Sequence, residues 1–425
     1  MTESAPNARM VHVLADDLTG STDTVVQFRQ AGWPAYLLLG GDPVPEVIGR
    51  DGPVAASRSL DTRALADEHA VSRTANAVDE LLGDPGARLY LKIDSTMRGS
   101  VAAQITGALH SWSRKHSDPV AVICPAYPQM ERIISQGRML VAGVPLHESP
   151  AGSDPVTPVH TSDMERLVPG SVTISLRDDG VGAAERIRRA GSDRVIVDAT
   201  DDDDLALLAA AINQLGDRAV PVGSAGLAKH LARAWHPGDS RSVARTASLE
   251  VGGVIVVAIA SLVHVSRRQR PHLVDTYGPR AVHRRLEGPE LADPESLRSW
   301  AADLTLSDQA RLIVLHPDPE PVATTDPATA ARTVATGMAA AVGGLVTADR
   351  VHALVLVGGD GAEATLAHLD AAALRVQGAA AEGVPLSRIV GGMAPDLPVV
   401  TKAGGFGSHS TLTDVVSAML DQKEA

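Results

Sequence analysis

The strongest constraint on the fold is a repeated alternation of short apolar runs with stretches that have helical periodicity. A strand–helix–strand order is typical of βαβ units, whose strands pair in parallel beneath covering helices. The chain is therefore predicted to be an α/β protein with two doubly wound domains and mainly parallel sheets. The predicted strands are residues 11–15, 36–39, 89–93, 120–124, 195–197 and 219–222 in the first half, and 254–259, 312–315, 353–357 and 397–401 in the second.

The chain is too long for one ordinary domain. Its 425 residues exceed the size at which a single hydrophobic core stops growing. A helical stretch over 225–235 is followed by HPGDSRSVARTAS, which is rich in Pro, Gly, Ser and Arg and has no periodicity. We therefore expect a first domain over 1–235, a linker over 236–250 and a second domain over 251–425.

Composition excludes several classes of protein. Only 2% of the residues are aromatic and the formal net charge is -13, so a nucleic-acid-binding surface is not expected. The one cysteine, Cys124, cannot form an intrachain disulfide, and the longest apolar run, near 251–263, is too short to span a bilayer. We expect a cytoplasmic protein without nucleic-acid or membrane partners. An anionic ligand would need a local cluster of Lys and Arg to overcome the global charge.

The segment ADDLTGSTD places Asp16 and Asp17 at the end of the first predicted strand. In a parallel sheet these ends open into the crevice where ligands bind, and a following helix offers free backbone N–H groups. Residues 19–21 are expected to form the turn into that helix. Neighbouring strand side chains point to opposite faces, so the two aspartates are expected to have different roles. The alternative is a structural role in capping the helix and complementing its dipole.

A second charged segment, KIDSTMRGS, ends the strand-like run LYLKI. It supplies the positive charge that an anionic ligand requires. Lys92 and Arg98 are candidates to hold a carboxylate or a phosphoryl group, since the guanidinium fork fits planar oxyanions. Asp94, Ser95 and Thr96 are candidates to bind sugar hydroxyls. The alternative is an ordinary loop in which Asp94 pairs with Arg98 on the surface.

Two other strand ends carry polar residues or prolines. Ser57 and Arg58 follow the apolar residues 54–56 and are candidates for the same ligand site, with a structural pair equally open. CPAYP ends another strand, and the prolines of the later segment HESPAGSDPVTPVH, residues 147–160, predict a rigid irregular loop. Cys124, at the start of CPAYP, is expected to be a small buried residue without a catalytic role.

Glycine-dense strand ends mark the second half. Residues 358–361 read GGDG, and residues 402–407 read KAGGFG. Glycines permit positive φ and expose N–H groups, which are the ingredients of an anion-binding nest for nucleotide phosphates. Neither segment fits the Walker pattern or the dinucleotide-binding GxGxxG pattern, so both of those folds are excluded on spacing. Structural turns remain the alternative.

Together these segments resemble the four-carbon acid-sugar kinase family over nearly the whole chain. The resemblance is carried by ADDLTGSTD at 15, SR at 57, KIDSTMRG at 92, CPAYP at 124, GSAGL at 223, GGD at 358 and KAGGFG at 402. It implies an N-terminal acid-sugar-binding domain, a C-terminal nucleotide-binding domain and an active-site cleft between them. It also implies ATP-dependent phosphorylation of threonate, erythronate or 3-oxo-tetronate.

The resemblance also implies the site residues. Those expected around the acid sugar are Asp16, Asp17, Ser57, Arg58, Lys92, Asp94, Ser95 and Arg98, and those expected at ATP are Ser261, Gly358, Gly359, Asp360, Gly361, Gly404, Gly405 and Gly407. We expect Asp17 to accept or orient the attacking hydroxyl, while Lys92 and Arg98 hold the carboxylate or the migrating phosphoryl group. Mg²⁺ is expected to bridge the phosphates, held mainly by their oxygens and by water. The protein ligands of the metal are not identified by the sequence, and Asp360 is the weakest candidate.

Several positions depart from the family pattern. A GSCS-like turn before Thr and Gln is replaced by residues 260–263, ASLV, before Ser266 and Gln269. A usual Thr is Gly361, and a usual Pro-Gly is Pro395-Asp396. These changes motivate an alternative function, a non-catalytic sensor that binds an acid sugar without ATP. An aldolase or dehydrogenase lacks support, because the chain has neither a dinucleotide fingerprint nor a metal-ligand cluster. Length and charge leave the assembly open, including a homodimer.

Overall fold

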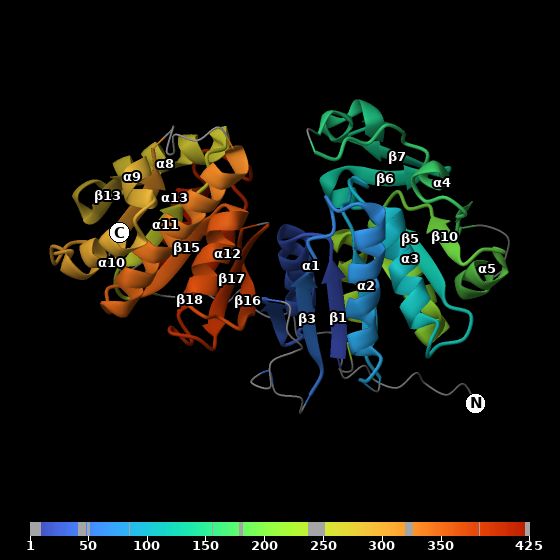
Figure 1. Cartoon of the computed structure of the whole chain (residues 1–425). Helices are drawn as coiled ribbons and strands as arrows, with labels where there is room; N and C mark the ends of the chain where they lie inside the picture. Colours follow the sequence, from blue (N-terminus) through green and yellow to red (C-terminus); the bar gives the residue numbers. More distant parts are fainter. Residues whose placement is uncertain are drawn as a thin grey trace. The chain divides into compact units, whose positions relative to one another are not determined.

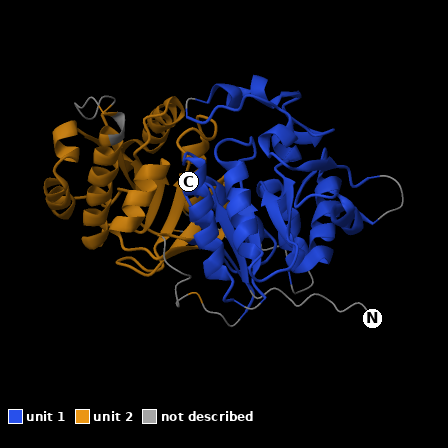
Figure 2. Cartoon of the chain, turned by 45° about the vertical axis from the view of Figure 1, so that its right-hand side comes forward, with its two compact units in different colours: residues 1–37, 49–244 blue, residues 38–48, 245–425 orange. Residues whose placement is uncertain are grey.

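The computed structural model describes residues 10–420 except 41–47, 49–51, 85, 155, 178–181, 237–250, 319–325 and 382. The chain forms two compact units (Figure 2). The first is Met1–Leu37 with Gly49–Ala244, and the second is Leu38–Ile48 with Arg245–Ala425. Apart from His236, the predicted linker lies outside the described residues.

The first unit is built on a parallel sheet with strand order β2-β3-β1-β4-β11-β5-β10-β9 (Figure 1). Its strands are β1 (Met10–Ala15), β2 (Ala35–Leu38), β3 (Val54–Ser59), β4 (Arg88–Lys92), β5 (Val120–Cys124), β9 (Val172–Ile174), β10 (Arg194–Val197) and β11 (Ala219–Gly223). Its α-helices are α1 (Leu18–Gln30), α2 (Asp67–Leu81), α3 (Val101–Trp112), α4 (Met164–Leu167), α5 (Ala183–Arg189), α6 (Asp202–Leu215) and α7 (Ala225–Ala234). The central strands are buried on both faces, which explains why they are continuous apolar runs.

A small antiparallel sheet in this unit was not predicted from the sequence. It contains β6 (Arg132–Ser135), β7 (Arg138–Val141) and β8 (Val144–Pro145) and precedes the predicted proline-rich loop 147–160, whose described residues contain no strand. Ile134 and Met139 pair across this sheet and are fully buried. Their apolar side chains anchor this sheet on the core of the first unit.

The second unit contains a sheet with strand order β13-β14-β12-β15-β18-β17-β16. Its strands are β12 (Ile255–Ile259), β13 (Ala281–Leu286), β14 (Leu312–Pro317), β15 (Ala353–Val357), β16 (Ala373–Ala381), β17 (Val384–Val390) and β18 (Pro398–Lys402). Its helices are α8 (His264–Tyr277), α9 (Gly288–Leu291), α10 (Pro294–Asp303), α11 (Pro327–Thr347), α12 (Gly359–His368) and α13 (Thr411–Met419). The sheet is mainly parallel, and only β17 runs antiparallel to both of its neighbours. The predicted α/β class is therefore confirmed.

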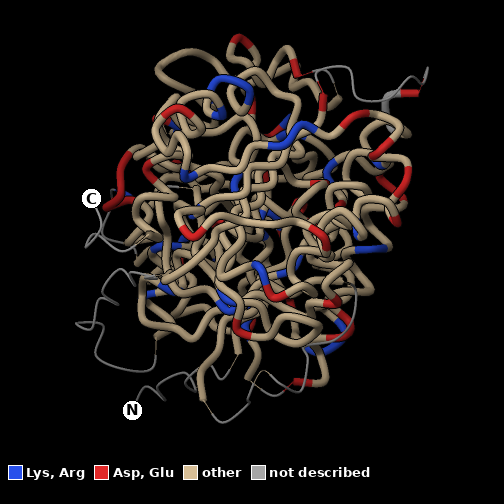
Figure 3. The backbone as a smooth tube through the Cα atoms, turned by 90° about the vertical axis from the view of Figure 1, so that its left-hand side faces the viewer, with Lys and Arg blue, Asp and Glu red and all other residues tan. Residues whose placement is uncertain are grey.

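Ser57 and Arg58 lie near the carboxyl end of β3, within the strand. One predicted boundary was wrong. Residues 19–21 belong to the first turn of α1, because Asp17 caps that helix and it begins at Leu18. Within the described part of the chain, we find no helix with both the length and the apolar character required to cross a membrane. Basic and acidic residues are interspersed along the backbone (Figure 3).

Candidate functional site

The two charged segments of the first unit meet because their strands are neighbours. β1 and β4 pair in parallel with Ala15 opposite Lys92, and the backbone N–H of Asp16 donates to the carbonyl of Lys92 at 3.1 Å. The Lys92 Nζ atom lies 4.0 Å from Asp16 Oδ1. ADDLTG and KIDSTMRG therefore form one cluster at the carboxyl edge of the sheet, where ligands bind in open α/β folds.

Arg63 joins this cluster, although the sequence analysis did not identify it. It lies in the loop after β3, and its guanidinium contacts three carboxylates. Its Nε is 2.7 Å from Asp16 Oδ2, one terminal nitrogen is 2.7 Å from Asp17 Oδ2, and the other is 3.5 Å from Asp94 Oδ1. Burial lowers the pKa of Arg63, but the carboxylates outweigh this and raise it. The sequence signal that could have identified Arg63 is its position shortly after β3, the strand that pairs with β1.

The adjacent aspartates have different environments. Asp16 is fully buried, and burial raises its pKa against the opposing charges of Lys92 and Arg63. Asp17 is the N-cap of α1, and its Oδ1 accepts a hydrogen bond from the Gly20 N–H at 2.7 Å. Asp17 is also partly exposed, with 26% of its side chain open to solvent. Asp17 therefore has the helix-capping role that was the structural alternative, and it also belongs to the charged cluster. Of the two aspartates, only Asp17 is accessible to a ligand.

The side chain of Arg98 donates two hydrogen bonds to Asp94. Arg98 Nε donates to Asp94 Oδ2 at 2.8 Å, and a terminal nitrogen donates to Oδ1 at 3.0 Å. The other terminal nitrogen of Arg98 reaches Asp154 at 2.9 Å. Burial raises the pKa of Asp94, but the Arg98 hydrogen bonds and the positive charges of Arg63 and Arg98 lower it well below its usual range. Asp94 is buried, so this pair is part of the cluster rather than an isolated surface pair.

The remaining predicted residues of the first unit make structural contacts. Ser95 accepts a hydrogen bond from Arg132. Ser57 donates to the carbonyl of Ser21 on α1 at 3.0 Å, whereas Arg58 turns to α2 and pairs with Glu80 at 2.6 Å. The side chains of Ser57 and Arg58 point in opposite directions because the two residues are consecutive in strand β3. Arg58 therefore forms the structural pair that the sequence left open.

The predicted nucleotide residues surround a cavity in the second unit. Its volume is about 340 Å³. It is lined by residues 260–263, residues 358–361, Gly404 and Gly405, together with Ala331, Val334 and Ala335 of α11. Gly407, with φ of 88°, belongs to the same loop as Gly404 but not to this lining. The first turn of α12 opens into the cavity and presents backbone N–H groups that can donate hydrogen bonds to an anion.

Close packing explains two of the glycines. A Cβ atom on Gly404 would lie 2.0 Å from Ser261 Oγ, so only glycine fits there. Gly358 has a φ of 108°, which disfavours other residues. Gly359 has open space at its Cβ position. The glycines near Ser261 therefore bring backbone close to the cavity, as a phosphate-binding nest requires.

Helix α8 fixes the glycine loop through two buried side chains. Ser266 Oγ donates to the carbonyl of Gly404 at 2.6 Å. Gln269 Nε2 donates to the carbonyls of Phe406 at 3.1 Å and Ser408 at 2.6 Å. These contacts give a positioning role to Ser266 and Gln269, which the sequence singled out only as neighbours of the changed turn.

Asp396 does not place its charge in the cavity. Its side chain is 73% exposed and accepts a hydrogen bond from Arg375 at 2.7 Å, and it is not among the lining residues. Within the described ranges, no group of three or more His, Cys, Asp or Glu side chains is arranged to hold a metal ion. Asp360 is the carboxylate that lines the cavity.

Comparison with known proteins places this arrangement in a family. Residues 11–231 match the model of a sugar-binding N-terminal domain, and residues 256–412 match that of a nucleotide-binding C-terminal domain. A D-threonate kinase of Bordetella bronchiseptica is 36% identical, over 97% of this chain and 98% of its own length. The chain belongs to the four-carbon acid-sugar kinase family.

Other members of this kinase family also match over nearly the whole length of both chains. A D-threonate kinase of Salmonella typhimurium is 31% identical over 95% of this chain and 97% of its own. A 3-oxo-tetronate kinase of Methylobacterium radiotolerans is 28% identical over 93% and 95%. The predicted enzyme class, a sugar-acid kinase, is thereby confirmed.

Solved structures support the fold. A Haemophilus influenzae protein has a TM-score of 0.72 at 21% identity, covering 96% of this chain and 100% of its own. A Salmonella typhimurium protein has a TM-score of 0.77 at 22% identity, covering 98% and 99%. At this level of identity the likeness concerns the fold alone.

Proposed function

We propose that this protein transfers the γ-phosphoryl group of ATP to a hydroxyl of a four-carbon sugar acid of the threonate, erythronate or 3-oxo-tetronate type. The observation that carries the proposal is the cluster in which Arg63 joins Asp16, Asp17 and Asp94 beside Lys92. The names of the family members supply the substrate class.

The cluster suits a small hydroxylated anion. Lys92, Arg63 and Arg98 supply positive charge for a carboxylate, and aspartate oxygens accept hydrogen bonds from sugar hydroxyls. Asp17 is the carboxylate with solvent access, so we assign it the attacking hydroxyl, whose proton it accepts or orients. Buried Asp16 instead holds Arg63 and Lys92 in place. Because Arg58 pairs with Glu80 of α2, it is the predicted residue that we consider least suited to bind the substrate.

The cavity of the second unit suits a nucleotide. Ala331, Val334 and Ala335 offer an apolar wall, while the glycine turns and the first turn of α12 offer N–H groups to phosphates. Bound ATP would supply the phosphoryl group, and Mg²⁺ would offset charge on its oxygens, with Asp360 as the available protein carboxylate. Phosphoryl transfer requires direct contact between the acceptor hydroxyl and the γ-phosphoryl group of ATP. The active-site cleft that the family resemblance implies therefore stays part of the proposal.

The sensor hypothesis loses part of its motivation. It rested on the changes at 260–263, Gly361 and Asp396. Asp396 pairs with Arg375 away from the cavity, and Gly361 makes room for the extra methyl group of Ala260. Calorimetry separates the two functions, because a kinase binds Mg-ATP and the sensor binds only the acid.

The decisive experiment measures ADP release with Mg-ATP over four-carbon aldonic and 3-oxo acids, using the native chain and Asp17→Asn. We expect the substitution to lower kcat by about 10²–10⁴-fold. Asn is as good an N-cap as Asp, so α1 is preserved.

Asp201→Asn is the matched control. Asp201 also caps a helix, α6, and also pairs with an arginine, Arg177 at 2.7 Å, but it lies outside the cluster. Its rate should equal that of the native chain. An undiminished rate in Asp17→Asn would exclude the assigned role. Activity confined to longer sugar acids would overturn the substrate class while keeping the kinase.

A further inference from the structure

The cations of the charged cluster in the first unit are already paired with aspartates. The cluster holds three cations and four carboxylates, which are Arg63, Lys92, Arg98, Asp16, Asp17, Asp94 and Asp154. Each cation has at least one of these carboxylates within 4.0 Å. A bound sugar acid adds a further negative charge, which is costly to hold away from water unless a cation offsets it.

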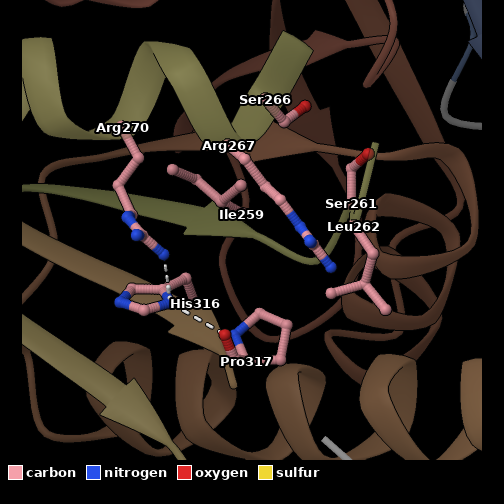
Figure 4. Close-up of a pocket in the computed structure, with 8 residues that line it drawn as sticks. All are labelled: Ile259, Ser261, Leu262, Ser266, Arg267, Arg270, His316 and Pro317. Carbon is pink, nitrogen blue, oxygen red and sulfur yellow. Dashed lines mark hydrogen bonds between the residues drawn. The ribbon is translucent and has the colours of Figure 1, made fainter. Parts of the chain in front are cut away.

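Arg132 is a cation beside this cluster, and none of the described carboxylates pairs with it. One of its terminal nitrogens donates a hydrogen bond to the hydroxyl of Ser95, the residue that follows Asp94. Its Nε is buried and has no partner within the described ranges. An arginine without a carboxylate can have another acceptor, as Arg270 has in His316 Nδ1 at 2.7 Å (Figure 4). Arg132 has only the Ser95 hydroxyl in the described part of the chain, so its other terminal nitrogen is left for a ligand.

The backbone around Arg132 fixes the direction of its side chain. Arg132 begins β6, in the small sheet that lies beyond the end of the parallel sheet (Figure 1). Ile134 is fully buried, and its N–H donates to the carbonyl of Ala199, just after β10, at 2.9 Å. Residues i and i+2 of a strand share a face, so Arg132 is directed toward the same strand ends. The Arg132 carbonyl also accepts from the Tyr127 N–H at 2.7 Å. The guanidinium is therefore positioned before a ligand arrives, which lowers the entropic cost of binding.

The chemistry of this position favours a carboxylate as the ligand group. The terminal nitrogens of a guanidinium form a fork that matches the two oxygens of a carboxylate. The aspartates of the cluster can accept hydrogen bonds from hydroxyl groups, but they repel a carboxylate. A site made of aspartates alone would therefore bind an uncharged polyol as well as a sugar acid, and Arg132 supplies the difference.

We propose that Arg132 binds the carboxylate of the substrate and makes the site specific for sugar acids over uncharged analogues. This inference rests on the proposed function for the identity of the ligand. It concerns the binding of the acid, which is measured without ATP and therefore separately from phosphoryl transfer.

The test compares the native chain with Arg132→Gln and Arg132→Lys. The ligands are threonate, erythronate and 3-oxo-tetronate, each paired with its uncharged amide. Calorimetry without nucleotide measures Kd, and ADP release with Mg-ATP measures KM and kcat. Arg132→Gln should raise the Kd and the KM of the acid about 10–100-fold, because a charge-assisted hydrogen bond is lost, and should leave the amide unchanged. Arg132→Lys keeps the charge without the fork, so its loss should be smaller.

Arg138→Gln is the matched control. Arg138 lies in β7, the neighbour of β6, and its side chain is exposed. The substitution removes the same charge from the same small sheet. Its Kd and KM for the acid should equal those of the native chain.

The outcomes separate this inference from the proposed function. A loss confined to the acid supports the inference, whereas an equal loss for acid and amide overturns it, because Arg132 would then only support the fold of the site. A native Kd in Arg132→Gln, or a lower kcat with an unchanged KM, overturns it and leaves the kinase proposal intact.

The remaining outcomes are equally informative. Acid binding that depends on Arg132 in a chain that releases no ADP supports the inference and contradicts the kinase proposal. A native chain that binds none of the acids overturns both. If Arg132→Gln fails to fold by circular dichroism, Arg132→Lys decides, since a loss for the acid without a loss for the amide is still required.

Discussion

Arg63 holds the three aspartates of the first unit in one arrangement. Without it, Asp16 would keep only Lys92, whose Nζ is 4.0 Å from Asp16 Oδ1, and would remain fully buried. A buried carboxylate that loses its ion-pair partner is costly, because neither water nor a hydrogen bond replaces the lost charge. The site and the stability of its surroundings therefore depend on the same side chain.

We expect Arg63→Met to lower the free energy of unfolding of the first unit by about 3–5 kcal/mol. Arg166→Met is the control, since Arg166 is 78% exposed and its partner Asp163 is 3.9 Å away. Exposed pairs of this kind contribute little. Denaturant unfolding followed by the fluorescence of the buried Trp33 and Trp112 measures both variants. Equal small effects would mean that Arg63 is not the partner on which Asp16 depends.

At the level of elements, two departures from the family pattern compensate for each other. Ala260 follows β12 and replaces a usual glycine, and Gly361 in the first turn of α12 replaces a usual threonine. A Cβ atom on Gly361 would lie 2.2 Å from the Cβ of Ala260. The methyl group of Ala260 thus occupies the space that a side chain at 361 would need, and the approach of α12 to the Ser261 turn is preserved.

A double-mutant cycle tests this reciprocity. Gly361→Ala alone should destabilise the second unit by about 1–3 kcal/mol through overpacking, although alanine is the better helix former. In the Ala260→Gly background the same change should be neutral or stabilising. Gly359→Ala is the control, because its Cβ would meet no atom within 4 Å. Additive effects in the denaturation midpoints would contradict the compensation.

At the scale of the whole molecule, the two units are proposed to bind different ligands independently. A ligand that binds only the folded state raises the melting temperature, by an amount that grows with the ratio of its concentration to Kd. We expect a four-carbon sugar acid and Mg-ATP each to stabilise the native chain. Arg98→Gln should remove most of the shift caused by the acid and keep that caused by Mg-ATP.

Gly404→Ala should show the opposite pattern, because its new methyl group would lie 2.0 Å from Ser261 Oγ. Differential scanning fluorimetry measures the four shifts. Each variant is the control for the other, since the retained shift shows that the chain is folded. Loss of both shifts in both variants would contradict independent binding.

The sequence by itself determined the α/β class and the positions of several strands. The strands predicted at 120–124 and 353–357 have those bounds in the structure, because a strand buried on both faces must be a continuous apolar run. The N-cap role open to Asp17 was also readable, because capping depends on residues only a few positions apart. Local periodicity and local hydrogen bonding are properties of short segments.

Only the tertiary structure decided which polar groups meet. The sequence gives no sign that Arg63 contacts Asp94, that Arg58 turns to α2 or that Asp396 lies away from the cavity. The antiparallel strand β17 was missed as well, since pairing with β16 and β18 is a long-range choice. An ion pair depends on distance in space, and strand order sets that distance between residues far apart in the chain. The sequence shows which charged side chains are present. The assembled sheets decide which of these side chains become partners.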